Sequence, residues 1–350
     1  MTENRIYQKN EWFITGNGDV NTALLKRQVP RSIIEACGAQ LQTIDQISLT
    51  TGIPATYIED ELKPLLNAGA VECQNNRYRT SMILRTQQSV KDAEAFLLGK
   101  AQSLSVPVSD ALEALLPKVR AIGFHGSDLP KERLYWSLIP ILMREAITIA
   151  RASEPALVRG AFPPHPDGSR GWLCAHVAPE GAHRYYSGCN TYFRDGSRFR
   201  NFWSYELYSD ELNRLLMKLE DVSFTDASVS ISDELLLAEC IRCDLIVRKD
   251  GMLEWNIPVF TPEEAKKMAS VVHEAAVELA GKLLPTVKGL YQRMLKDIPA
   301  HLHDQIRGIF GIECNSIIEM LCELLLNKPE AAPFAGQVIM FVNASDAPHM

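Results

Sequence analysis

The order of helix and turn signals in residues 22–86 constrains the fold more than any other feature of the chain. A helix with Pro30 in its first turn should end at Gly38, since proline suits helix starts and glycine suits helix ends. A capping box begins at Thr43, a pattern that satisfies the exposed N–H groups at a helix start. We expect that second, short helix to end at Gly52.

A third helix is expected over residues 55–67, because its apolar residues recur on one face. These residues are Ile58, Leu62, Leu65 and Leu66. Two short strand-like runs follow, residues 71–73 and 77–79, on either side of the polar turn Gln74-Asn75-Asn76. This arrangement is typical of a β-hairpin.

This order of elements resembles the winged helix-turn-helix of bacterial transcription regulators. Residues 43–53 resemble its first helix and turn, residues 55–67 its recognition helix and residues 71–80 its wing. The resemblance implies that the recognition helix enters the major groove of double-stranded DNA and that the wing touches the backbone or minor groove. The DNA-binding residues that it implies are Thr56, Tyr57, Lys63, Asn67, Asn75, Asn76, Arg77 and Arg79.

Charge leaves DNA binding open. The chain carries 36 basic and 43 acidic side chains, a net charge of −7. Residues 209–350 carry an excess of acidic side chains, whereas residues 1–90 carry equal numbers of the two and are neutral. Asp60 nevertheless lies near the centre of the face that would meet DNA, although affinity for DNA depends on cationic contacts to phosphates. Pro64 should kink or restart the recognition helix. The alternative is a winged helix that docks on a protein.

Aromatic side chains are concentrated between Arg170 and Tyr208, where ten of the 27 in the chain are found. We expect one hairpin to join residues 172–177 to 183–188 and a second to turn at Asp195-Gly196, a strong hairpin signal. Such a sheet could bind a ligand through Trp172, Arg184, Tyr186, Arg198 and Trp203. The alternative is an ordinary small sheet with an aromatic core.

No metal, cofactor or catalytic site is predicted. In the first expected hairpin, Cys174 and His176 lie on one face and His183 on the other, so these residues and Cys189 do not converge on a metal ion. Cys240 and Cys243 form a CxxC on an expected helix without a second pair. No recognised catalytic motif occurs, so we predict that the protein is not an enzyme.

The acidic C-terminal third combines a helix and hairpin with long helices. Residues 232–257 look like a second, degenerate winged helix with its turn at Lys249-Asp250-Gly251. A capped helix start at Thr261 leads into an apolar row at steps of three and four, with a bend expected at Pro285. The row comprises Met268, Val272, Ala275, Leu279, Leu283, Val287, Leu290, Met294 and Ile298. Such helices pack within the chain or dimerise, and we expect a homodimer.

The predicted fold class is α+β and helix-rich, with five regions. They are a winged helix-turn-helix (1–86), a helical linker or dimerisation region (87–155), an aromatic β-rich sensor-like domain (156–208), a degenerate second winged helix (209–260) and a C-terminal helical domain with an apolar tail (261–350). No stretch has the roughly 20 apolar residues of a membrane span, and the start lacks a secretory signal.

The whole chain also resembles a group of bacterial proteins with an N-terminal winged helix and a helical C-terminal region. The motifs that carry this resemblance are the Pro-Val-Phe-Thr of residues 258–261 and the Pro-x-His-Leu-x-x-Gln of residues 299–305. The resemblance implies a transcription regulator, associated in some members with a sigma factor or RNA polymerase. We therefore expect a cytoplasmic, DNA-binding homodimer with a middle domain that senses a ligand or partner. The alternative is a regulatory protein-interaction module that does not bind DNA.

Overall fold

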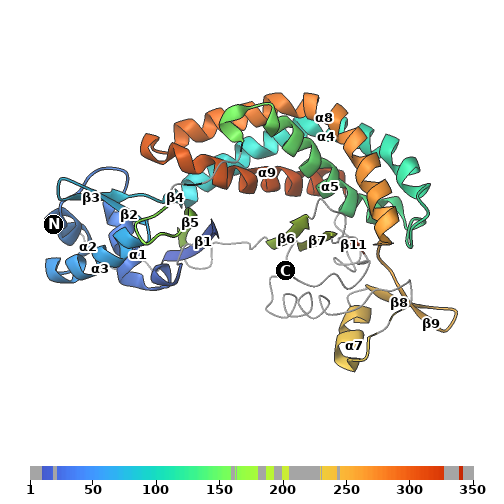
Figure 1. The fold of residues 1–350 in the computed structure, drawn as a ribbon, viewed down its shortest axis with the longest axis horizontal. Coiled ribbons are helices and arrows are strands. Elements are labelled where there is room, and N and C mark those ends of the chain that lie inside the picture. Colours follow the sequence, from blue (N-terminus) through green and yellow to red (C-terminus); the bar gives the residue numbers. More distant parts are fainter. Residues whose placement is uncertain are drawn as a thin grey trace. The chain divides into compact units, whose positions relative to one another are not determined.

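The protein has an α+β fold rich in helices, seen in a computed structural model (Figure 1). The structure describes residues 10–18, 22–158, 162, 164–179, 187–192, 199–204, 229, 231–242, 245–326 and 339–341. The chain forms two compact units, each assembled from separate segments. The first unit comprises residues 1–97, 151–183 and 285–315, and the second comprises 98–150, 184–284 and 316–350.

A helix–hairpin module, residues 28–80, lies in the first unit, and we call it the first module. Its elements are α1 (Gln28–Cys37), α2 (Ile44–Thr51), α3 (Ala55–Asn67), β2 (Val71–Gln74) and β3 (Arg77–Thr80). Gly38 follows α1, and Thr43 and Gln46 form the predicted capping box of α2. Gln42 and Tyr78 form an isolated bridge that ties the α1–α2 connection to the hairpin. Three short 3-10 helices lie elsewhere, η1 (Ala23–Lys26), η2 (Pro155–Leu157) and η3 (Ala300–Leu302).

Of the two outcomes predicted for Pro64, a kink or a restart, the restart does not occur in α3. The helix runs unbroken from Ala55 to Asn67, and the Pro64 carbonyl accepts a hydrogen bond from the Ala68 N–H at 3.0 Å. A proline removes only its own N–H, whose helical acceptor here would be the carbonyl of Asp60. Because Asp60 is exposed, water can take the place of that donor.

A three-stranded sheet completes the first unit. Its central strand β5 (Gly171–Pro179) pairs antiparallel with β1 (Asn10–Gly18) and parallel with β4 (Ile83–Thr86). Trp12 of β1 and Leu173 and Ala175 of β5 are buried in the same core cluster as Ile33 and Ile58 of the first module. The sheet therefore packs on the module.

The predicted hairpin between residues 172–177 and 183–188 is wrong. Strand β5 takes β1 and β4 as its neighbours, so both of its edges are occupied. The local turn signal at Pro179-Glu180-Gly181 suggested a neighbour close in sequence, whereas the strand that supplies the apolar side chain of Trp12 comes from the start of the chain. Core packing decides the pairing, and a turn motif alone does not.

Long helices form much of the second unit. These are α4 (Gln87–Arg120), α5 (Lys131–Ala152), α8 (Pro262–Asp297) and α9 (His303–Leu325), of which residues 98–120, 131–150, 262–284 and 316–325 belong to this unit. Lys118 of α4 pairs with Glu274 of α8 at 3.7 Å, and Glu145 of α5 meets His273 of α8 at 2.8 Å. Helix α8 therefore lies beside both α4 and α5.

The apolar row of α8 is buried within the chain. Its most deeply buried members are Met268, Val272, Leu279, Leu283, Val287, Leu290 and Met294. The helix continues through Pro285. Because these side chains are already covered, the row does not offer a free surface for dimerisation.

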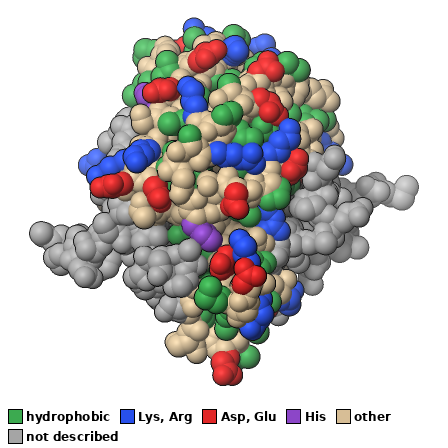
Figure 2. Space-filling view, turned by 90° about the vertical axis from the view of Figure 1, so that its right-hand side faces the viewer, with side chains coloured by type: hydrophobic (Ala, Val, Ile, Leu, Met, Phe, Trp, Pro, Cys, Tyr) green, Lys and Arg blue, Asp and Glu red, His purple; other side chains and the backbone are tan. Residues whose placement is uncertain are grey.

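Among the residues that the structure describes, no helix combines the length and apolarity needed to cross a membrane. Figure 2 shows acidic and basic side chains interspersed over the face that it draws.

A second helix–hairpin module lies in the second unit. It consists of α7 (Glu234–Arg242), β8 (Ile246–Lys249) and β9 (Met252–Trp255), and we call residues 234–255 the second module. A four-stranded sheet accompanies it, in the order β10 (Val259–Phe260), β11 (Ile339–Phe341), β7 (Phe199–Ser204), β6 (Ser187–Tyr192). Strands β6 and β7 pair antiparallel on either side of residues 193–198, which contain the predicted Asp195-Gly196 turn and lie outside the described residues.

The two modules repeat one backbone plan. Val71 pairs with Thr80 in the first hairpin and Ile246 with Trp255 in the second, so the registers coincide when 175 is added to the first residue numbers. The same shift relates the hydrogen bond from Ala70 N to Leu65 O, 3.0 Å, to that from Leu245 N to Cys240 O, 2.9 Å. The two hairpins and the helix end before each of them therefore repeat one plan, in a region where the sequence shows only a slight similarity.

The repeat extends to the strands and helices that follow each hairpin. Thr86 caps α4 through the Ser89 N–H, as Thr261 caps α8 through the Glu264 N–H. Strand β4 runs parallel to β5, as β10 runs parallel to β11. Strands β5 and β11 then pair antiparallel with β1 and β7. The order helix, hairpin, strand and long capped helix thus occurs twice among the described residues.

Each hairpin is contacted by the helical connection of the other repeat. His301, between α8 and α9, donates through Nε2 to the Thr80 carbonyl at the end of β3, at 2.8 Å. His125, between α4 and α5, donates through Nε2 to the Trp255 carbonyl at the equivalent end of β9, at 2.6 Å. Each compact unit therefore holds a hairpin from one repeat and a helical connection from the other.

Candidate nucleic-acid interface

The exposed face of α3 carries the side chains that its periodicity predicts. Ile58, Leu62 and Leu65 are buried in the core of the first module. The opposite face exposes Thr56, Tyr57, Lys63 and Asn67, with Tyr57 at 65% exposure. A 3.6-residue period separates these two sets of residues, so the sequence alone suffices to place them.

The tip of the first hairpin is a tight turn with two left-handed residues. Asn75 has φ 52° and Asn76 φ 58°, the two positive values that a type I′ turn requires and that asparagine tolerates. Both side chains are exposed, as is Arg77 at the start of β3. The turn therefore presents two amides and one guanidinium to solvent.

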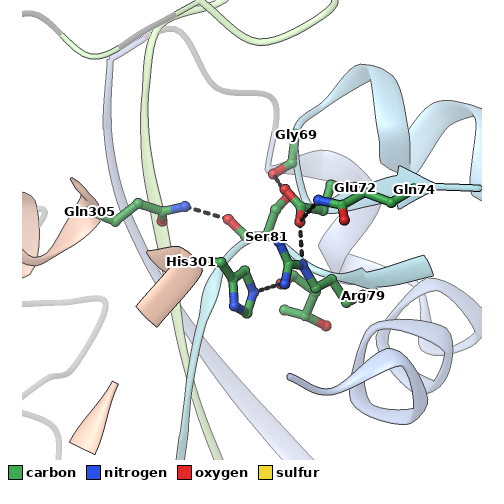
Figure 3. Close-up of polar contacts among 8 residues, drawn as sticks. Gly69, Glu72, Gln74, Arg79, Ser81, His301 and Gln305 are labelled. Atoms are coloured by element: carbon green, nitrogen blue, oxygen red, sulfur yellow. Dashed lines mark hydrogen bonds and ion pairs between the residues drawn. The ribbon is translucent and has the colours of Figure 1, made fainter. Parts of the chain in front are cut away.

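Arg79 is occupied within the hairpin, and this differs from the expected role in DNA contact. It forms an ion pair with Glu72, its cross-strand partner, and Gln74 also donates to Glu72 at 3.4 Å (Figure 3). A cation held by a neighbouring carboxylate has less charge to offer a phosphate. Arg79 is also only partly exposed, whereas Arg77 is exposed.

A second ion pair neutralises Glu61, one of the acidic side chains of α3. Arg27, just before α1, donates to both carboxylate oxygens of Glu61 at 2.8 and 2.7 Å. Sequence reasoning missed this pair, because Arg27 lies 34 positions from Glu61 and no short-range spacing connects them. Glu61 is thereby neutralised, while Glu59 and Asp60 stay exposed.

The charge that remains on this surface is nearly balanced. Lys63 and Arg77 are exposed and have no acidic partner within ion-pair distance among the residues that the structure describes. Glu59 and Asp60 are the exposed acids beside them on α3. Among the described residues, this surface therefore carries two exposed cations, Lys63 and Arg77, and two exposed carboxylates, Glu59 and Asp60.

The loop of residues 164–170 lies at the end of α3, a neighbour that the sequence did not reveal. The Asp167 N–H donates to the Asn67 carbonyl at 3.1 Å, which satisfies a terminal helix acceptor. Gly69 has φ +66°, and a Cβ there would lie 1.9 Å from Nδ1 of His165. Close approach of this loop thus requires glycine after the helix.

The figure also shows how the base of the hairpin is held. Ser81 donates through its hydroxyl to the Gly69 carbonyl at 2.6 Å, and the Ser81 carbonyl accepts from Gln305 (Figure 3). With the His301 contact to Thr80, two side chains of the Pro-x-His-Leu-x-x-Gln motif bind the adjacent carbonyls of Thr80 and Ser81, at the end of the first module. The motif is therefore structural.

The residues expected to form a ligand site do not share one sheet. Trp172 is buried on β5, packed against Gly308 of α9. Trp203 lies on β7, a strand of the other sheet. Arg184, Tyr186 and Arg198 lie outside the described residues.

The described residues include no cluster that could hold a metal ion, and several of their cysteines are buried. No group of three His, Cys, Asp or Glu side chains there is arranged to hold a metal ion. Cys174 and Cys189 lie on strands of different sheets. Burial raises the pKa of Cys37, Cys174 and Cys314 to about 12, so these thiols stay protonated and unreactive.

Comparison of the chain with protein-family models, curated proteins and solved structures gave no match. What the first module can bind therefore has to follow from its own residues and geometry.

Proposed function

We propose that the first module is a winged helix-turn-helix and that the protein is a transcription regulator that binds double-stranded DNA through it. In this proposal α3 is the recognition helix and the β2–β3 hairpin is the wing. The supporting observation is that Lys63 of α3 and Arg77 of the wing are both exposed and have no acidic partner within the described part of the chain. Thr56, Asn67, Asn75 and Asn76 surround them with hydrogen-bonding groups suited to bases and sugar-phosphate.

The number of exposed cations sets the salt dependence expected for DNA binding. Each cation that neutralises a phosphate contributes about −0.9 to the slope of log affinity against log salt. With Lys63 and Arg77 as the contacts, a single module should therefore show a slope of roughly −2. Asp60 and Glu59 oppose binding, so specific affinity depends on the polar contacts more than in a strongly basic domain.

Fluorescence polarisation with a mixed-sequence duplex at low salt, followed by a salt titration, tests the proposal. The double variant Lys63→Ala with Arg77→Ala should weaken binding and flatten the salt slope. Asp60→Asn should strengthen binding several-fold, because it removes a repulsive charge without changing side-chain size. The opposite signs of these two changes distinguish an interface from a general loss of fold.

Lys266→Ala, on the exposed start of α8, is the matched control and should leave binding unchanged. The proposal fails if the wild-type protein binds no duplex at low salt. It fails equally if Asp60→Asn and the double variant bind as the wild type does.

A second function, docking on the transcription machinery, is favoured by one observation. Leu49 on α2 is 89% exposed, and Asp45 on the same helix is also exposed. An exposed leucine on the same helix as an exposed acid suits a basic, apolar protein surface better than DNA. If this function holds, Leu49→Ser should abolish binding to RNA polymerase or a sigma factor and leave duplex affinity unchanged.

Such a regulator would work in the cytoplasm. Free thiols in the described part of the chain include the buried Cys37 and the exposed Cys73. Free thiols are stable in a reducing compartment.

A further inference from the structure

The second module keeps the backbone of the first but changes its exposed side chains. With the shift of 175, Asp60 of α3 corresponds to Leu235 of α7, and Arg77 of the wing corresponds to Met252. Leu235 is 80% exposed and Met252 is 66% exposed. At these two positions the second module thus carries an exposed apolar side chain in place of a charged one, including the position of the wing arginine assigned to DNA.

The outer face of α7 carries an ordered set of residues. Glu234, Leu235, Ala238, Ile241 and Arg242 are all exposed, while Leu236 and Cys240 turn into the core. Exposed leucine and isoleucine residues on one helix face indicate that another surface covers them. In Figure 1, α7 is the short helix beside the β8–β9 hairpin.

This face is symmetric about Ala238. Leu235 and Ile241 stand three positions to either side of it, and Glu234 and Arg242 stand four positions to either side. When two such helices pack antiparallel, each leucine meets the isoleucine of the other helix and each glutamate meets the arginine. The alanine at the centre lets the two backbones approach closely.

We propose that α7 is a self-association surface, on which a second copy of the chain packs its own α7 antiparallel about a two-fold axis. An isologous contact requires one patch to be complementary to itself, and this face meets that requirement in the placing of both its charged and its apolar side chains. A basic peptide would meet Arg242 and an acidic peptide would meet Glu234, so neither matches the face as well as the chain itself does.

Arg242 already pairs with Glu239 on its own helix, with Nε to Oε2 at 2.8 Å. Exposed pairs of this kind contribute little stability, so Arg242 can shift to a second partner at low cost. A nine-residue helix offers less area than a standard stable interface. The dimer should therefore be weak and depend on concentration.

Sedimentation velocity on the full chain, over about two orders of magnitude in protein concentration, tests the proposal. The wild type should shift from monomer to dimer. Leu235→Ser with Ile241→Ser should weaken dimerisation by at least about tenfold, because each substitution acts twice in a symmetric contact. Thermal unfolding of each variant checks that these exposed substitutions leave the fold intact.

Charge reversal provides the sharper arm of the experiment. Glu234→Arg and Arg242→Glu should each weaken the dimer, and the two together should restore it, because the pairing is then inverted but still complementary. Ala238→Cys should form a covalent dimer on oxidation more readily than the wild type, whose exposed Cys73 provides the background.

Two results overturn the proposal. One is a wild-type protein that stays monomeric throughout the concentration range. The other is a dimer that the α7 substitutions leave unchanged, which would place the contact elsewhere. The DNA experiments on the first module decide a separate question, because none of their substitutions lies on α7.

Discussion

At the residue scale, the periodicity of α3 predicts which side chains are exposed, and longer-range contacts decide what those side chains can do. Thr56, Lys63 and Asn67 lie on the outer face because a helix repeats every 3.6 residues. The charge left on that face depends on Arg27 and Arg79, which are held by Glu61 and Glu72. Such ion pairs depend on how separate elements pack, which a single sequence does not encode in local spacing.

Two glycines of α9, Gly308 and Gly311, differ in what packs against them and provide a matched pair for experiment. A Cβ at Gly308 would lie 2.4 Å from Cδ1 of Trp172, whereas a Cβ at Gly311 meets nothing within 4 Å. We expect Gly308→Ala to destabilise the protein by about 1–3 kcal/mol through overpacking. Gly311→Ala should stabilise it by about 0.5–1 kcal/mol, because alanine is the better helix former.

Urea unfolding followed by circular dichroism and by tryptophan fluorescence measures both effects. If Gly308→Ala proved as stabilising as Gly311→Ala, α9 would not pack against Trp172 as described here.

At the scale of elements, local signals predict helices and tight turns well and strand partners poorly. The capping box at Thr43 and the hairpin around Asn75 and Asn76 form as their residues indicate, because each depends on a few adjacent positions. Strand β5 was assigned the wrong partner because its actual neighbour β1 lies at the other end of the first repeat. Nothing near β5 in the sequence identifies that partner.

The histidine contacts to the two hairpins are a second feature of this scale that sequence reasoning missed. His301 donates to the carbonyl of Thr80, a buried residue, and His125 donates to that of Trp255. His301→Leu should leave the Thr80 carbonyl without that donor, at a cost of about 1–3 kcal/mol. His301→Asn keeps an N–H donor and should recover part of the loss.

Hydrogen exchange locates the effect. His301→Leu should speed amide exchange in β2 and β3, far away in sequence, and His125→Leu should do the same in β8 and β9. Faster exchange confined to residues next to each substituted histidine would contradict the assigned contacts.

At the scale of the whole molecule, neither compact unit is one continuous stretch of sequence, because the repeated elements are exchanged between the units. Each compact unit contains a hairpin from one repeat and a helical connection from the other, so segments distant in sequence complete each core. The sequence suggests the second hairpin from its Lys249-Asp250-Gly251 turn. It does not suggest that each hairpin contacts the helical connection of the other repeat. His125 and His301, which make these contacts, share only their residue type and their position between two long helices.

This exchange has a consequence for a chain cut between the repeats. Residues 1–183 and residues 184–350 each contain segments of both units. The first half lacks residues 285–315, which complete the first unit, and the second half lacks residues 98–150, which complete the second unit. Neither half can therefore complete a core alone. We expect each half expressed separately to unfold without a cooperative transition, and the two halves expressed together to purify as a one-to-one complex that unfolds cooperatively.

Calorimetry and co-purification through a tag on one half measure these outcomes, with the uncut chain as control. His301→Leu placed in the second half should weaken the complex, because the contact to Thr80 then lies between two chains. A first half that folded cooperatively alone would mean that residues 1–183 need no contact from the second repeat. The reciprocal docking would then be a consequence of folding and not a requirement for it.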